Sequence, residues 1–111
     1  MYKYVEMNGQ QVKLVSNALL PRLYRNHFGS DLMVDFRHIK EEYDKNGDET
    51  FDTTIFERIT WLMLKQGGND VGETIDEWLE NTDLMDFYNC IGTVVGLLQE
   101  SQKTTAKPKK K

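Results

Sequence analysis

An apolar repeat in the last third of this 111-residue chain limits its fold more than any other pattern. Seven apolar residues recur at offsets of 0, 3, 4, 7, 10, 11 and 14: Leu84, Phe87, Tyr88, Ile91, Val94, Val95 and Leu98. This spacing places all seven on one side of an α-helix. We predict a helix over 84–99, started by Thr82 or Asp83, whose apolar stripe lies in the core. Gly92 and Gly96 lie four residues apart on this helix, where they either let another backbone approach closely or are simply tolerated as poor helix formers.

Earlier segments show the same helical spacing. We predict helices from Ser16 or Pro21 to Phe28, over 31–43 after a Ser30 cap, over 53–66, and a short one opened by a capping box at Thr74 and Glu77. The stripe of the second helix is Leu32, Phe36, Ile39 and Tyr43. The third is apolar on most sides, which indicates a central position or a second face for a partner.

The N-terminal residues show a different period. Two runs alternate between apolar and polar residues on either side of Asn8-Gly9, which is a strong signal for a β-hairpin with a type I′ turn. We therefore expect a mostly α (α+β) chain with an N-terminal hairpin over about 2–15 and a compact bundle of four to five helices. Residues 1–102 form the single domain, and 103–111 form a disordered basic tail.

Charge is divided unevenly between this domain and the tail. Residues 103–111 hold five of the 14 Lys and Arg residues and no acid, which leaves nine bases against 18 acids and a net charge of −9 for residues 1–102. Such a domain repels nucleic acid backbones. No apolar run is long enough to cross a membrane. The single cysteine, Cys90, fits a reducing compartment and a small buried position, rather than a nucleophile.

A polar loop between two helices resembles a calcium-binding sequence. Within 44–55, the residues Asp44, Asn46, Asp48 and Asp52 match four ligand positions of an EF-hand. Glu49 stands where that loop needs Gly, and Ile55 stands where it needs a bidentate Glu. We interpret the segment as a solvated turn, and a calcium-responsive binding module remains the alternative.

No catalytic or cofactor pattern appears in the sequence. His27 and His38 lack zinc-ligand spacing, and no nucleophile stands in a motif with a base. Seven acids without an intervening base lie between positions 70 and 86: Asp70, Glu73, Asp76, Glu77, Glu80, Asp83 and Asp86. They fit either a solvated face with favourable helix N-termini or a docking face for a basic partner. We expect no enzyme activity, cofactor or metal.

The order of several motifs resembles a known family. Tyr24-Arg25-x-x-Phe28-Gly29-x-Asp31-Leu32 follows the hairpin and Pro21, and then come Ile75-Asp76-Glu77-Trp78-Leu79, the striped helix and Lys107-Pro-Lys-Lys-Lys111. This arrangement is similar to that of the tail assembly chaperones of long-tailed phages and prophages of Gram-positive bacteria, in their short form made before a programmed frameshift. The resemblance covers essentially the whole chain.

The resemblance implies a role in tail morphogenesis. Such chaperones act in the host bacterial cytoplasm, coat and solubilise the tape measure protein, and are absent from the mature virion. A longer frameshifted product is thought to recruit the tail tube protein, and the adenine-rich codons of Lys109–Lys111 fit a slippery end. Homo-oligomers would suit repeated binding along one tape measure.

A chaperone of this kind needs apolar surface that a partner can cover. We expect Trp61, Leu64, Trp78 and Met85 at or near it, because aromatic residues and Met are enriched at interfaces. The alternative for all four is a position in the core. A second alternative is a small regulatory protein that uses its basic tail on nucleic acid.

Overall fold

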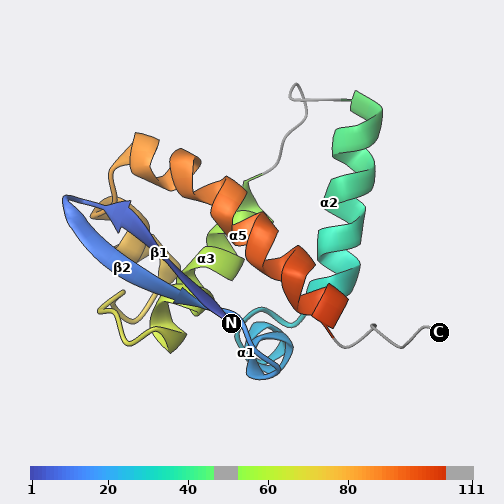
Figure 1. Ribbon diagram of the computed structural model, residues 1–111, viewed down its shortest axis with the longest axis horizontal. Helices are drawn as coiled ribbons and strands as arrows, with labels where there is room; N and C mark the ends of the chain where they lie inside the picture. Colours follow the sequence, from blue (N-terminus) through green and yellow to red (C-terminus); the bar gives the residue numbers. More distant parts are fainter. Residues whose placement is uncertain (47–52, 105–111) are drawn as a thin grey trace.

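The computed structural model describes the backbone of residues 1–46 and 53–104, and the side chains of 1–41 and 53–100. Its elements follow in the order β1 (Tyr2–Met7), β2 (Gln10–Val15), α1 (Leu19–Phe28), α2 (Leu32–Asn46), α3 (Thr54–Gln66), α4 (Ile75–Glu80) and α5 (Leu84–Thr104). The predicted fold class, an N-terminal hairpin followed by helices, is therefore confirmed (Figure 1).

The hairpin pairs its strands antiparallel, with Tyr2 opposite Val15 and Met7 opposite Gln10. Asn8 and Gly9 connect them with positive φ values of 56° and 81°, as a type I′ turn requires. The inward face of the sheet carries Met7 and Leu14, which are both buried. A lone hairpin is marginal in water, and here it gains its support from α3 and α5.

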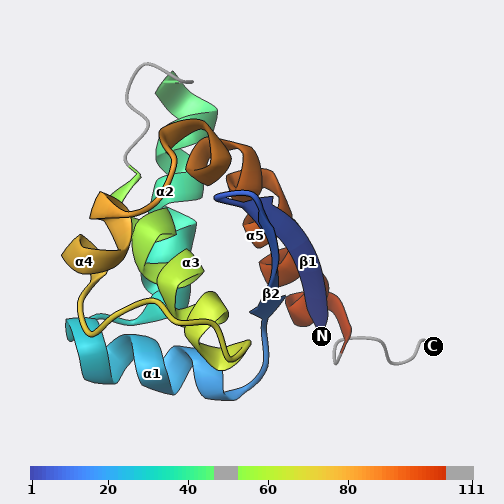
Figure 2. The ribbon, with the colours of Figure 1, turned by 90° about the vertical axis from the view of Figure 1, so that its left-hand side faces the viewer.

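Helix α3 lies at the centre of the molecule. It contacts β2 and each of the other four helices, and Figure 2 shows it between α4 and the pair formed by α5 and the hairpin, with α1 below. Its residues are buried almost without interruption from Ile59 to Leu64. Of the two alternatives that its apolar surface left open, the structure shows the central position.

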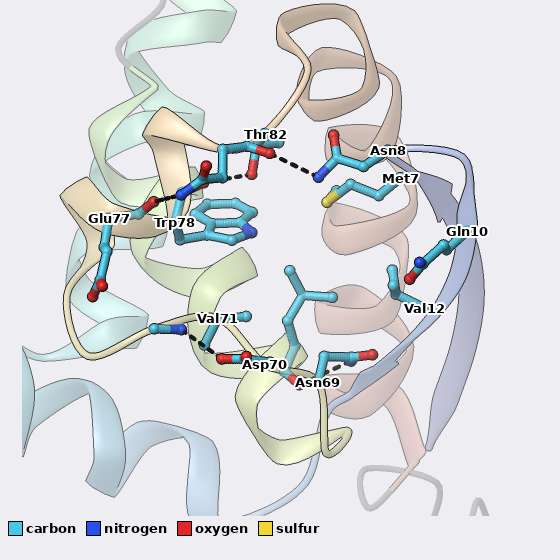
Figure 3. Close-up of a pocket in the computed structure, with 13 residues that line it drawn as sticks. Met7, Asn8, Gln10, Val12, Asn69, Asp70, Val71, Glu77, Trp78 and Thr82 are labelled. Atoms are coloured by element: carbon cyan, nitrogen blue, oxygen red, sulfur yellow. Dashed lines mark hydrogen bonds between the residues drawn. The ribbon is translucent and has the colours of Figure 1, made fainter.

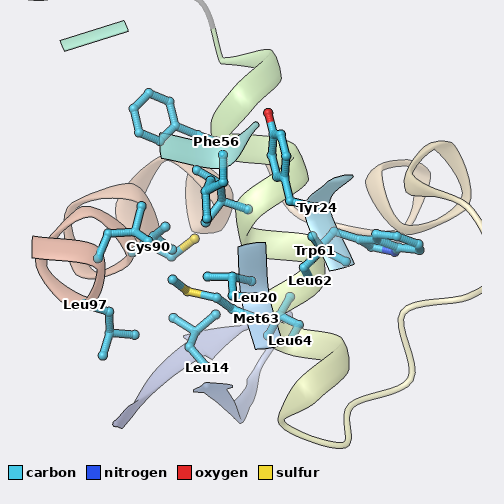
Figure 4. Packing of buried hydrophobic residues seen from close by; sticks show 14 of the residues in the cluster. Leu14, Leu20, Tyr24, Phe56, Trp61, Leu62, Met63, Leu64, Cys90 and Leu97 are labelled. Carbon is cyan, nitrogen blue, oxygen red and sulfur yellow. The ribbon is translucent and has the colours of Figure 1, made fainter. Parts of the chain in front are cut away.

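The core is one continuous cluster to which every element contributes (Figure 4). Leu14 from β2, Leu20 and Tyr24 from α1, and Leu62 from α3 are almost fully buried. The predicted α2 stripe is confirmed at Leu32, Phe36 and Ile39, while the side chain of Tyr43 lies outside the described residues. The residues that face the core from α5 are Phe87, Cys90, Val94, Leu97 and Leu98.

The predicted stripe of α5 is therefore wrong in part. Leu84 and Tyr88 are 65% and 46% exposed, and Ile91 and Val95 are only half-buried. The core also contains two residues that the predicted stripe leaves out, Cys90 and Leu97. Cys90 lies about 100° round the helix from Ile91, and Leu97 lies about 100° from Leu98. No close backbone approach occurs at Gly92 or Gly96 within the described residues, because a Cβ added at either would meet nothing within 4 Å.

Several predicted helix ends also need correction. Helix α1 starts at Leu19, where the backbone N–H donates to the side chain of Asn17, so Ser16 is not the cap. Ser16 is buried, and its backbone N–H donates to the carbonyl of Met1. Pro21 is the third helical residue, where a missing N–H leaves no hydrogen bond unmade. Gly29 ends the helix in the left-handed conformation, as expected.

Helix α2 starts one residue later than predicted because Asp31, rather than Ser30, caps it. One carboxylate oxygen of Asp31 accepts the N–H groups of Met33 and Val34. These bonds, with the Val34 N–H as the largest cause, hold the pKa of Asp31 below its usual value. At its other end α2 continues to Asn46, and α5 continues to Thr104, past the expected Gln99.

The capping box at α4 is confirmed in one half only. Thr74 accepts the N–H of Glu77 at 3.1 Å. The carboxylate of Glu77 reaches back one residue further than predicted and accepts the N–H of Glu73 at 2.9 Å. Gly72, at φ 72°, makes room for this contact, since a Cβ there would lie 2.8 Å from the Glu77 carboxylate.

Candidate functional site

A cleft of about 480 Å³ opens between the hairpin and the segment that runs from the end of α3 into α4 (Figure 3). Its apolar lining combines Met7 and Val12 of the hairpin with Leu64, Val71 and Trp78. Its polar lining consists of Asn8, Gln10, Asn69, Asp70, Glu77, Asn81 and Thr82. This mixture of an apolar floor with carboxylate and amide groups around it suits an apolar side chain flanked by basic or hydrogen-bonding groups.

Asn8 fixes one end of the cleft. Its backbone N–H donates to a carboxylate oxygen of Asp86 at 2.8 Å, and its side-chain amide donates to the carbonyl of Asn81 at 3.0 Å. Its side-chain oxygen accepts the N–H of Asp83 at 2.8 Å. The turn of the hairpin is thereby joined to the connection between α4 and α5, more than 70 residues away in the sequence.

Asn69 fixes the opposite end. Its side-chain amide donates to the carbonyl of Lys13 at 2.8 Å and to the carbonyl of Leu64 at 3.0 Å. The neighbouring Gly67 has no side chain to keep the two segments apart, since a Cβ there would overlap the Lys13 carbonyl oxygen. The strand β2 and the end of α3 are held together as one wall, so the cleft has fixed sides.

Trp61 supports the cleft from behind. Its indole N–H donates to the carbonyl of Val71 at 3.1 Å, inside the core. The ring also packs edge-on against His27, with 5.4 Å between ring centroids, and lies beneath the ammonium group of Lys65 at 4.7 Å. The hydrogen bond holds Val71 in the wall of the cleft. It also lets a tryptophan on α3 be buried without leaving its indole N–H unpaired.

The four predicted partner-binding residues do not share one surface. Trp61, Leu64 and Trp78 are at least 94% buried, so each has little side-chain surface accessible in the isolated molecule. Leu64 and Trp78 nevertheless both line the cleft. Met85 is 58% exposed and lies on α5, outside the lining of the cleft. Whether any of the four contacts a partner stays a prediction.

The acidic segment contributes both structure and free charge. Asp83 caps α5 by accepting the N–H of Asp86 at 3.1 Å, and Asp70 accepts the N–H of Gly72 at 3.2 Å. All seven acids except Asp86 are exposed. The ion pair between Arg25 and Asp31 lies far from this segment in sequence. The segment therefore keeps its negative charge beside the cleft.

Cys90 is buried on the inner side of α5, as predicted. Its thiol donates to the carbonyl of Phe87, and burial raises its pKa to about 11. The thiol is thus protonated at neutral pH, which is unfavourable for a nucleophile.

The remaining predicted sites gain no support. Among the described residues no three His, Cys, Asp or Glu side chains gather in a way that could hold a metal ion. The side chains of Asp44, Asn46, Asp48 and Asp52, which form the calcium alternative, lie outside the described residues, as does most of the basic tail. Within the described chain, no helix has the length and apolar character needed to cross a membrane.

Sequence reasoning missed the two asparagines that shape the cleft. In the sequence, Asn8 stands in a turn signal, and Asn69 follows the two glycines after the predicted 53–66 helix. No local signal separates an asparagine chosen for its backbone conformation from one whose amide also joins two distant segments.

Comparisons of the chain with protein-family models, with curated proteins and with solved structures give no match.

Proposed function

We propose that the protein is a tail assembly chaperone that coats and solubilises a tape measure protein during phage tail morphogenesis. The proposal starts from the order of sequence motifs, which resembles that family. The observation that supports it best is the cleft, whose lining includes both Leu64 and Trp78 beside exposed acids. In this proposal the chaperone acts in the host cytoplasm and leaves before the virion is complete. A longer frameshifted product would bring the tail tube protein.

The chemistry of the cleft specifies the kind of segment that would bind. An apolar side chain from the client would cover Val12 and the edge of Trp78, which are available from the hairpin side and the α4 side of the cleft. Basic residues beside it would meet Asp70 and Glu73, which are exposed. A helical client with apolar side chains every three or four residues and scattered Lys or Arg meets both requirements.

Co-expression with the very long gene expected beside this one tests the function. The tape measure protein should be soluble with this chain and aggregated without it. If it is equally soluble in both cultures, the proposed function fails.

A charge reversal tests the cleft separately. Asp70→Lys should reduce co-purification of the client several-fold, because it reverses the charge at the rim. Glu41→Lys makes the same change at an exposed position on α2 and should bind as the wild type does. Equal loss with both variants would indicate an effect of net charge alone, and would remove the cleft from the proposal.

A further inference from the structure

The outer side of α5 carries an apolar band that nothing in the described chain covers. At its N-terminal end stand three large exposed side chains, Leu84, Met85 and Tyr88, with exposed fractions of 65%, 58% and 46%. The band continues through half-buried Ile91 and Val95, beside the open positions Gly92 and Gly96. Figure 1 shows α5 crossing the front of the molecule as a long helix.

The side chains in the two halves of this band have complementary sizes. Large side chains occupy its first half, and glycines with a β-branched residue occupy its second. Helices pack by fitting large side chains into spaces between small ones. If two copies of α5 run antiparallel and cross near residue 90, Tyr88 of one copy falls opposite Gly92 of the other. Leu84 then falls opposite Gly96, and the match occurs twice because the pair is symmetric.

Charge favours the same arrangement. The exposed acids of residues 70–83 precede the N-terminal end of α5, while residues 105–111, with four lysines, continue from its C-terminal end. Antiparallel pairing brings the basic segment of each copy to the acidic segment of the other. Within one molecule these regions lie at opposite ends of a helix about 30 Å long. Seven residues span about 25 Å at most, which is less than the length of this helix, so the acids of a second copy are the nearer ones in the antiparallel arrangement.

We propose that the outer face of α5 is a self-association surface, whose occupant is α5 of a second copy in antiparallel orientation. Tyr88 and Leu84 pack over the glycines of the partner, and the lysines of 105–111 meet the acids of its 70–83 segment. This surface is separate from the cleft, and the inference does not depend on the proposed client. Each dimer would present two clefts.

Sedimentation of the full chain over a concentration series tests the surface. The wild type should form dimers, and Tyr88→Lys should raise the dimer Kd by about tenfold or more, as expected for a central interface residue. Glu41→Ala, a change at an exposed position on α2, should leave the Kd unchanged. A wild type that stays monomeric at millimolar concentration overturns the proposal, as does a dimer that Tyr88→Lys does not affect.

Gly92→Ala separates association from folding. The substitution should stabilise the monomer, because alanine is the better helix former and its Cβ meets nothing within 4 Å. The same Cβ should weaken the dimer several-fold by occupying the space for Tyr88 of the partner. A variant that is more stable and dimerises equally well would contradict the proposed packing.

Disulfide trapping tests the orientation. When single variants Leu84→Cys and Gly96→Cys are mixed, the mixed disulfide should form fastest, since these positions face each other across the pair. Native Cys90 is buried and should react little. Faster formation of the Leu84→Cys homodisulfide would indicate parallel helices and overturn the arrangement. Removing 105–111 should weaken the dimer at low salt and have no effect at 1 M salt, and an equal effect at both would exclude the charge contact.

Discussion

Helices α3 and α5 are the two most apolar helices of the chain, yet the fold uses them in opposite ways. Helix α3 has neighbours on nearly every side, and seven of its 13 residues are buried. Helix α5 packs mainly on β1 and α3, and its outer side exposes Leu84, Met85 and Tyr88. Its apolar stripe is the more regular of the two. Regular spacing therefore shows that a helix has an apolar face, but the number of neighbouring elements decides how much of that face is buried.

The difference has a functional consequence. The apolar surface of α3 is used up inside the molecule, where it holds the hairpin, the other helices and the back of the cleft together. The surplus on α5 remains available to a second polypeptide. Substitutions on the two helices should therefore act on different properties, stability for α3 and association for α5.

The largest expected effect is that of Leu62→Ala. Leu62 is fully buried on α3, so the change removes packing on all sides and leaves a cavity. The free energy of unfolding should fall by about 3 kcal/mol, measured by urea denaturation followed by circular dichroism. A loss below about 1 kcal/mol would mean that α3 is less tightly enclosed than described.

Gly67→Ala tests the junction between the end of α3 and β2. The added Cβ would overlap the Lys13 carbonyl oxygen, and a backbone atom cannot move aside as a side chain does. We expect a loss of about 1–3 kcal/mol in the same urea assay. Gly92→Ala is the matched control on α5, where space is open, and it should instead gain about 0.5–1 kcal/mol. The comparison would fail if the two changes had the same sign.

The pH dependence of stability tests the packing of α1 against α3, because α1 carries the buried Tyr24. Its phenol donates to a carboxylate oxygen of Asp35 at 2.8 Å, and burial raises its pKa to about 12 from 10.0. The folded state therefore favours the protonated phenol. This contribution is complete below pH 10, where the unfolded chain also keeps its proton, and is lost as the pH rises towards 12.

Tyr24→Phe removes both the hydrogen bond and the titration. The variant should be less stable than the wild type by about 1 kcal/mol at pH 7, and this gap should shrink between pH 10 and pH 12. Urea denaturation of both proteins at pH 7, 10 and 11 measures it. Cys90 titrates in the same range in both proteins and does not affect the difference. A constant gap would contradict the assigned role of the phenol.

The smallest effect on folding is expected for Leu84→Ala. The side chain is 65% exposed, so its truncation should change the free energy of unfolding of the dilute monomer by less than about 0.5 kcal/mol. Thermal melts at low protein concentration would show this. A loss comparable to that of Leu62→Ala would place Leu84 in the core and remove the contrast between the two helices.

Much of the fold could be predicted because its causes are local. The Asn8-Gly9 turn, the Gly29 helix end and the Thr74 cap each depend on the conformational preferences of a few neighbouring residues. The burial of Leu32, Phe36 and Ile39 followed from spacing alone, since α2 has one apolar face. The choice of Asp31 over Ser30 as a cap did not follow, because adjacent residues of similar capping strength differ only in backbone geometry.

The candidate site depended on contacts that no local pattern records. The sequence by itself determined the hairpin, the succession of helices, the separation of acidic and basic charge, and the presence of Leu64 and Trp78 as large apolar side chains. Only the tertiary structure decided that these two line one cleft, that Asn8 and Asn69 hold its ends, and that α5 turns Leu84 and Tyr88 outward. Periodicity reports which residues share a face of one element, whereas burial depends on which other elements pack against that face.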